Sequence, residues 1–170
     1  MGERRIAVRR TLRRRDAETV WEALADIPAH VEWMADAEAI RFTSSQHQGV
    51  GTAFECDTKV GPFRLCDHME VTRWEPPRTM SVRHAGVVTG EGTFTVQRRG
   101  NGTIVRWDET LRFPWWIPSA PAAVALHLIW RGNLRRFERT LPPRSPADRP
   151  VAATAGRGAR RRGRRRRRGP

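Results

Sequence analysis

Three residues able to give or take protons interrupt sets of apolar residues in this sequence: Asp67, His84 and Glu109. Around each of them apolar side chains recur at every second position, and the titratable residue falls in step with them. Alternate residues of a strand face the same side of a sheet, so we expect these three side chains to point inward. A buried carboxylate beside an imidazole would keep it charged and oriented, as general acid–base catalysis requires. We therefore predict Asp67, His84 and Glu109 as catalytic residues.

A structural role is the alternative for the same residues. Asp67 and His84 would then form an internal ion pair, and Glu109 would reach water or an arginine such as Arg73. A further hypothesis is that all three bind the polar end of an otherwise apolar ligand. The sequence leaves these interpretations open.

No motif for a metal ion or a cofactor accompanies these residues. The five histidines have no short spacing between them, and Cys56 and Cys66 are ten residues apart rather than in a Cys-x-x-Cys pair. Gly49-Val50-Gly51 continues to Phe54 where a dinucleotide fingerprint needs a third glycine, and no P-loop is present. We expect no metal site and no cofactor.

Strands must position the three residues, because from Ala39 onward apolar residues alternate with polar ones. Short turns rich in glycine and proline separate the segments, which predicts antiparallel neighbours. The expected strands cover residues 39–44, 51–60, 63–74, 79–86, 92–99 and 103–113.

The turns predict which residues face one another. Around Gly100-Asn101 the predicted pairs are Val96 with Val105, Phe94 with Trp107, and Gly92 with Glu109. Around Pro76 they are Val71 with Met80, Met69 with Val82, and Asp67 with His84. Around Gly61-Pro62 an even register puts two sets of residues on the same side of the sheet. The sets are Phe54, Cys56, Thr58 and Val60 on one strand and Phe63, Leu65, Asp67 and Met69 on the other. Because this register turns Cys56 inward and Cys66 outward, we expect no disulfide.

Helices flank the strands. A first strand through Ile6, Val8 and Leu12 precedes a short helix that Asp16 can cap. A second short helix over residues 28–34 should turn Val31 and Met34 inward. The longest helix runs from Ser119 to Leu141, with apolar residues at steps of three or four and Ser119 as a possible cap. Nearly every residue in 120–130 is apolar, so we expect that half to be covered on most sides.

The order β-α-α-β6-α resembles the helix-grip fold, an α+β fold in which a curved antiparallel sheet wraps a long C-terminal helix. Four stretches resemble the polyketide cyclase/dehydrase-like branch of the START/SRPBCC superfamily: residues 20–26, 49–52, 71–78 and 102–107. The resemblance covers residues 5–141, and we assign residues 1–141 to one helix-grip domain. It implies a cavity between the sheet and the long helix for a medium-sized hydrophobic or aromatic molecule. The branch often uses inward tyrosines, and this chain has none.

The residues expected to line that cavity come from the strands, the last loop and the long helix. We predict ligand-binding roles for Phe54, Leu65, Met69, Val82, Phe94, Trp107, Phe113, Trp115, Trp116, Leu126 and Trp130. Trp115 and Trp116 lie in a proline-bounded loop and have three possible roles. They could plug the end of the sheet as core, form the rim of a cavity mouth, or dock on a membrane or partner.

Positive charge is concentrated at the C-terminus. The formal net charge is +14, and residues 144–170 contain eleven arginines and a single acid, Asp148. We predict that residues 142–170 form a disordered tail, either solvated without a role or in contact with nucleic acid or anionic lipid. The first fifteen residues have no apolar core of a signal peptide and no apolar run is long enough to span a bilayer, so we expect a cytoplasmic protein.

Three functional hypotheses follow from these features. The first is a small-molecule binding protein, which could also be a polyketide cyclase/dehydratase-type enzyme. The second is a non-enzymatic lipid or quinone carrier that docks on membranes through Trp115, Trp116 and the basic tail. The third is a nucleic-acid-associated protein. Neither the ligand nor the oligomeric state follows from the sequence.

Overall fold

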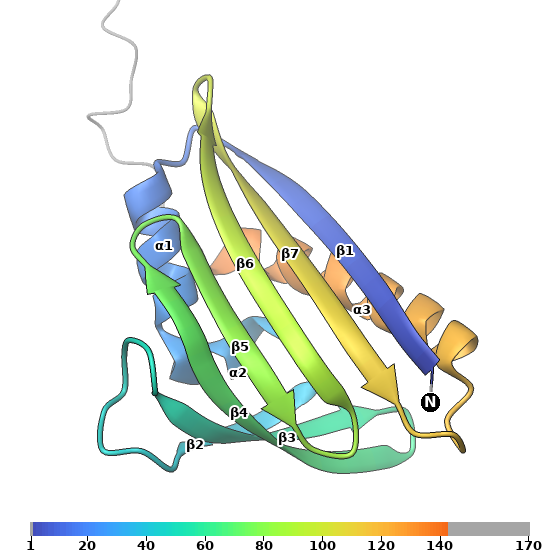
Figure 1. Ribbon diagram of the computed structural model, residues 1–170. Helices are drawn as coiled ribbons and strands as arrows, with labels where there is room; N and C mark the ends of the chain where they lie inside the picture. Colours follow the sequence, from blue (N-terminus) through green and yellow to red (C-terminus); the bar gives the residue numbers. More distant parts are fainter. Residues whose placement is uncertain (1, 143–170) are drawn as a thin grey trace, which may run out of the picture.

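The computed structural model describes residues 2–142, and residues 143–170 of the predicted tail lie outside this range. Seven strands form one antiparallel sheet in the order β1-β7-β6-β5-β4-β3-β2 (Figure 1). The strands are β1 (Gly2–Arg13), β2 (Ala37–Phe42), β3 (Ala53–Val60), β4 (Phe63–Glu75), β5 (Thr79–Ala85), β6 (Thr89–Arg99) and β7 (Gly102–Phe113). The helices are α1 (Ala17–Ala25), a single 3-10 turn (Ile27–Ala29), α2 (His30–Trp33) and α3 (Ser119–Thr140).

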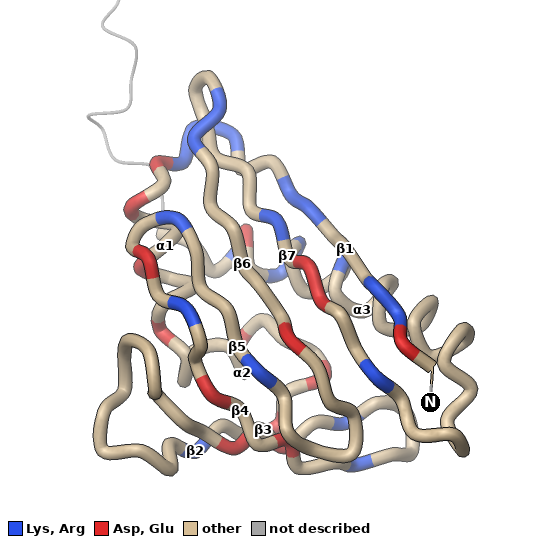
Figure 2. Tube along the Cα trace, viewed as in Figure 1, with Lys and Arg blue, Asp and Glu red and all other residues tan. Residues whose placement is uncertain are grey.

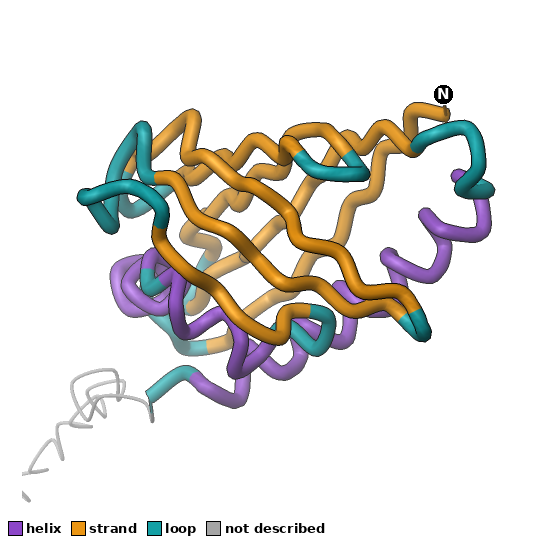
Figure 3. Tube along the Cα trace, turned by 90° about the horizontal axis from the view of Figure 1, so that it is seen from below, coloured by secondary structure: helices purple, strands orange, loops and turns teal. Residues whose placement is uncertain are grey.

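The sheet curves around α3, which confirms the predicted helix-grip fold. Figure 3 shows the helices along one side of the curved sheet, and β2 and β3 cross beneath the other strands in Figure 1. Arg10 of β1 pairs with Glu138 of α3, and the apolar side chains of Leu134 and Phe137 are buried beneath that half of the helix. The second half of α3 therefore closes the core.

The first half of α3 is less covered than the sequence predicted. Val124 and Leu128 are 62% and 61% exposed, and buried positions begin only at Trp130. The predicted cap is also wrong, since α3 has Pro118 at its N-cap and no capping bond from a side chain. In this half of the helix, one side faces the sheet and the other side faces solvent, although both sides are apolar.

The elements after β1 follow their local sequence. Asp16 caps α1 by accepting a hydrogen bond from the Thr19 backbone N–H at 2.7 Å, as predicted. The second short helix differs in orientation, because Val31 is 37% exposed while Trp33 is only 2% exposed. Met34 is partly buried against the core, as expected.

Two of the three predicted hairpin registers are confirmed. β6 and β7 pair as expected, with Phe94 opposite Trp107 and Gly92 opposite Glu109. β3 and β4 also pair as expected, which leaves Cys56 buried, Cys66 exposed and both cysteines free.

The register between β4 and β5 was predicted wrongly. Met69 lies opposite His84 and Val71 opposite Val82, so Asp67 does not face His84. Residues 76–78 form a longer turn between the paired Glu75 and Thr79, and the ladder shifts by one residue between Val71 and Arg73. The two effects move the pairing while leaving the same residues on the inner face.

Aromatic rings fill the core beneath α3. Trp33 packs against Phe137 with ring centroids 5.1 Å apart, and Trp107 stacks on Trp130 at 4.6 Å. Phe94 lies beside Trp107 at 4.9 Å. This cluster closes one end of the space between sheet and helix and leaves the other end open for a site.

Candidate functional site

A cavity of about 770 Å³ lies between the concave face of the sheet and the first half of α3. Its wall is mainly apolar and comes from α2, strands β2 to β7, the loop after β7, and α3. Pro121, Ala122 and Ala125 line the helix side together with the larger Leu126 and Trp130. The first three side chains are small. These small residues allow α3 to pass over the sheet without filling the space beneath it.

Ten of the eleven predicted ligand-binding residues line this cavity: Phe54, Leu65, Met69, Val82, Phe94, Trp107, Phe113, Trp116, Leu126 and Trp130. Trp115 does not line it, because its side chain is 87% exposed. Of the three roles considered for the loop tryptophans, the one as core is therefore wrong for Trp115. Contact of the other ten with a ligand stays a prediction.

The predicted catalytic residues also lie on the cavity wall, where they form a polar end in an apolar space. Glu109 is 5% exposed and accepts a hydrogen bond from Trp107 Nε1 at 2.8 Å. Its Oε1 lies 3.6 Å from His84 Nε2. Gly92 makes room for this carboxylate, since a Cβ there would lie 2.7 Å from Glu109 Oε1. The alternative partner Arg73 binds Glu75 instead, at 2.9 Å.

Asp67 sits across from Gly86 and is only partly satisfied. Thr58 Oγ1 donates to its Oδ2 at 3.2 Å, while its buried Oδ1 has no partner among the described residues. A Cβ on Gly86 would lie 2.5 Å from that Oδ1. Burial raises the pKa of Asp67, and His84 and Thr58 oppose the rise. An acceptor atom is thus held in the wall without a donor from this part of the chain.

His84 joins the two carboxylates electrostatically. Burial by itself lowers the pKa of His84, but the charges of Glu109 and Asp67 and the contact with Glu109 outweigh burial and raise it. The imidazole is therefore biased toward its charged form, with negative charge on either side.

The sequence did not single out two further polar residues on the wall, His30 and Asp36. His30 Nε2 donates to the Leu24 carbonyl at 2.8 Å, and burial lowers the pKa of His30 to about 4. The Asp36 carboxylate accepts from Asn133 Nδ2 at 2.7 Å and from Trp130 Nε1 at 3.3 Å. His30 begins the four-residue helix α2, and Asp36 lies in the turn before β2. Segments this short show no apolar periodicity from which the direction of a side chain could be predicted.

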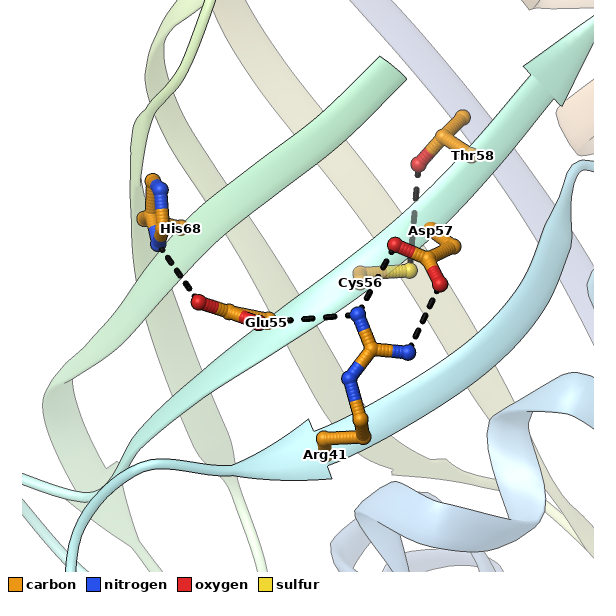
Figure 4. A network of polar contacts seen from close by, with 6 residues as sticks. All are labelled: Arg41, Glu55, Cys56, Asp57, Thr58 and His68. Atoms are coloured by element: carbon orange, nitrogen blue, oxygen red, sulfur yellow. Dashed lines mark hydrogen bonds and ion pairs between the residues drawn. The ribbon is translucent and has the colours of Figure 1, made fainter. Parts of the chain in front are cut away.

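The outer face of the sheet carries charge in pairs. Figure 4 shows Arg41 of β2 bridging to Asp57 and Glu55 of β3, and Glu55 reaching His68 of β4. Figure 2 shows that basic and acidic residues both occur along the strands of the sheet. Charged side chains of these strands thus pair on the outside, while Cys56 and Thr58, next to them in sequence, line the cavity.

Exposed aromatic residues mark the mouth of the cavity. Phe63 and Trp116 line the cavity and are also 65% and 53% exposed, and Trp115 directly precedes Trp116 in the loop after β7. We refer to Phe63, Trp115 and Trp116 as the mouth rim. Large aromatic side chains left in water are typical of a surface that contacts something apolar.

Within residues 2–142, no group of three or more His, Cys, Asp and Glu side chains is placed to hold a metal ion. Over the same residues, no helix combines the length and the hydropathy needed to cross a membrane.

The fold agrees with a comparison of the sequence with protein families. Residues 3–142 match the model of the polyketide cyclase/dehydrase and lipid transport family. The chain belongs to this family, which lies within the SRPBCC group. Among curated protein sequences, no significant match was found.

Solved structures of low sequence identity share the fold. A protein of Thermus thermophilus has a TM-score of 0.69 at 15% identity, with 80% of this chain and 95% of the other covered. A major latex-like protein of Panax ginseng has a TM-score of 0.66 at 13% identity, covering 83% and 99%. The ZhuI aromatase/cyclase of Streptomyces sp. R1128 has a TM-score of 0.63 at 14% identity, covering 81% and 90%. At these identities the likeness concerns the fold.

Proposed function

We propose that this protein binds a medium-sized hydrophobic or aromatic small molecule in the cavity beneath α3. The observation that carries this proposal is the cavity itself, about 770 Å³ in volume and lined mainly by apolar and aromatic side chains. Sites for small molecules are typically concave, apolar and about 300–1,000 Å³ in volume, with a few placed polar groups. The family's association with polyketide cyclases and lipid transport supports the same class of ligand.

The polar end of the cavity is compatible with chemistry on the bound molecule. In a cyclase/dehydratase-type reaction, Glu109 and His84 would take a proton from an activated carbon and protonate a departing hydroxyl group, which leaves as water. Asp67 would support the charge on His84. The positions of Glu109 and His84, 3.6 Å apart and on the cavity wall, support this role.

Displacement of a neutral fluorescent probe tests the binding proposal. N-phenyl-1-naphthylamine should fluoresce with the purified protein, and Val82→Trp, which places an indole in the cavity, should abolish the signal. Gln97→Trp is the matched control, because Gln97 is exposed on the neighbouring strand. Equal probe binding by both variants and the wild type would contradict the proposal. Native mass spectrometry of freshly purified protein would identify a retained molecule.

A second candidate function is non-enzymatic carriage of a lipid or quinone, with docking on membranes through Trp115, Trp116 and the basic tail. The exposure of Trp115, at 87%, favours this function, because an indole is more stable at a membrane interface than in water. The carrier should move ligand between vesicles without altering it, and Trp115→Ser with Trp116→Ser should slow transfer. Unchanged transfer by this double variant would exclude docking through these residues.

The arginine-rich tail supports a separate contact with polyanions. Residues 144–170 should increase retention on heparin or on anionic vesicles at low salt, because each neutralised phosphate or sulfate releases a counterion. A chain truncated after residue 143 should lose this retention. If truncation leaves retention intact, the contact belongs to the folded domain.

A further inference from the structure

Over the described residues, the cavity wall carries negative charge and no fixed cation. The chain contains 32 lysine and arginine residues, yet none of them is among the described residues that line the cavity. Three carboxylates line it: Asp36, Asp67 and Glu109. Of the two histidines on the wall, His30 is neutral near pH 7, since burial lowers its pKa to about 4.

The hydrogen-bond donors near these carboxylates are already engaged. Trp107 donates to Glu109, Asn133 donates to Asp36, and Thr58 donates to one oxygen of Asp67. The other oxygen of Asp67 is buried and has no partner within residues 2–142, although the residue as a whole is 9% exposed and lines the cavity. Buried polar atoms are nearly always hydrogen-bonded, and this oxygen packs against Gly86, where a Cβ would lie 2.5 Å from it. No donor of the described residues therefore offsets this part of the Asp67 carboxylate.

The remaining histidine on the wall, His84, lies between two acids. It is within 3.6 Å of Glu109 and interacts electrostatically with Asp67. Its charge balances one carboxylate, so the polar end retains an excess of acceptors and of negative charge. A ligand carboxylate or phosphate placed there would meet like charge without a compensating arginine or lysine from the described wall.

We propose that the cavity selects apolar molecules that carry a hydrogen-bond donor at the polar end, such as a phenol, an alcohol or a protonated amine, and rejects carboxylates and phosphates. This inference rests on the proposed binding function and specifies its ligand class. The donor group lies at the polar end formed by the Asp67 and Glu109 carboxylates and His84, and the apolar body occupies the rest of the cavity.

Ligands with one ring system and different polar groups test the selection at pH 7.5. 2-(Aminomethyl)naphthalene, which is protonated, and 2-naphthoate both lose hydration on entering the cavity, so their difference reports the sign of the local charge. Displacement of N-phenyl-1-naphthylamine should require about tenfold less of the ammonium than of the carboxylate. 2-Naphthol should in turn displace the probe at lower concentration than 2-methylnaphthalene does.

Neutralising one carboxylate of the polar end should weaken the selection. Asp67→Asn should bring the ammonium-to-carboxylate ratio at least threefold closer to one, whereas Glu70→Gln, on the outer face of the same strand, should leave it unchanged. A wild-type protein that binds 2-naphthoate as tightly as the ammonium, while still binding the probe, overturns the ligand class alone. A wild-type protein that binds no probe overturns the binding function and the ligand class together.

Discussion

Asn133 is the residue whose removal should most directly loosen the helix above the cavity. It is fully buried on α3 and contacts the segment between α2 and β2 in two ways. Its Nδ2 donates to the Asp36 carboxylate at 2.7 Å, and its Oδ1 accepts from the Ala35 backbone N–H at 3.0 Å. Asp36 in turn lines the cavity and accepts from Trp130. Asn133→Ala therefore removes a hydrogen bond to a charged group and leaves a backbone donor unpaired.

The size of the effect follows from these two bonds. A hydrogen bond to a charged group contributes about 1.5–3 kcal/mol, and a neutral one about 0.5–1.5 kcal/mol. The expected loss is thus about 2–4 kcal/mol in the free energy of unfolding. With an unfolding entropy of about 2.1 cal/mol/K per residue, a domain of this size should melt about 7–14 °C lower.

Urea denaturation and thermal melting measure the change, with Arg135→Ala as the control. Arg135 lies on the same helix, is exposed, and should change stability by less than about 0.5 kcal/mol. A loss below about 1 kcal/mol for Asn133→Ala would refute the reasoning, because the two hydrogen bonds would then contribute no more than an ordinary surface contact.

Three other predictions address buried groups. His30, whose folded pKa of about 4 lies below the usual 6.5, binds its proton more readily when unfolded, so stability should fall by about 3 kcal/mol as the pH drops from 6.5 to 4. His30→Gln should flatten that part of the pH profile in urea titrations. In the native protein a thiol reagent at pH 8 should modify Cys66 alone, because burial raises the pKa of Cys56 to about 11 and excludes the reagent. Gly92→Ala should cost about 1–3 kcal/mol in denaturation, since its methyl group displaces Glu109.

Each of these has a control and a contrary result. A His30→Gln profile parallel to the wild type between pH 6.5 and 4 would mean that other groups control acid stability. Cys66→Ser should abolish modification of the native protein, and rapid modification that persists would place Cys56 within reach. Gly132→Ala is the control for Gly92→Ala, because a Cβ at Gly132 meets nothing within 4 Å; equal stability of the two variants would contradict the crowding at Glu109.

The arrangement of strands was predictable because local chemistry fixed it. A two-residue turn at Gly100-Asn101 set the register of β6 and β7. The alternation of apolar and polar residues along β7 indicated which side of the sheet Glu109 faces. The same alternation did not determine which residue of the neighbouring strand lies opposite a given residue. Asp67 was expected opposite His84, and the longer turn and the register shift in β4 place it further along, beside Gly86.

The cavity itself was harder to predict. The continuous apolar run in the first half of α3 indicated burial for the stretch around Val124 and Leu128, but one side of that stretch faces solvent and the other faces the cavity. A sequence shows which side chains are apolar. It does not show whether the side chains opposite them are long enough to fill the space between. Asp36 and Asn133 are far apart in the sequence, and no local sequence pattern predicts such a contact.

The pairing of β1 with β7 has a consequence for how the chain acquires its structure. Gly2 lies opposite Phe113, so within this sheet the first strand to be synthesised must wait for the last one before it can pair. Until then its apolar face at Ile6, Val8 and Leu12 has no sheet to join. Such distant partners make assembly slow and leave an unpaired edge during synthesis, so nascent chains of this protein should depend on chaperones until β7 emerges.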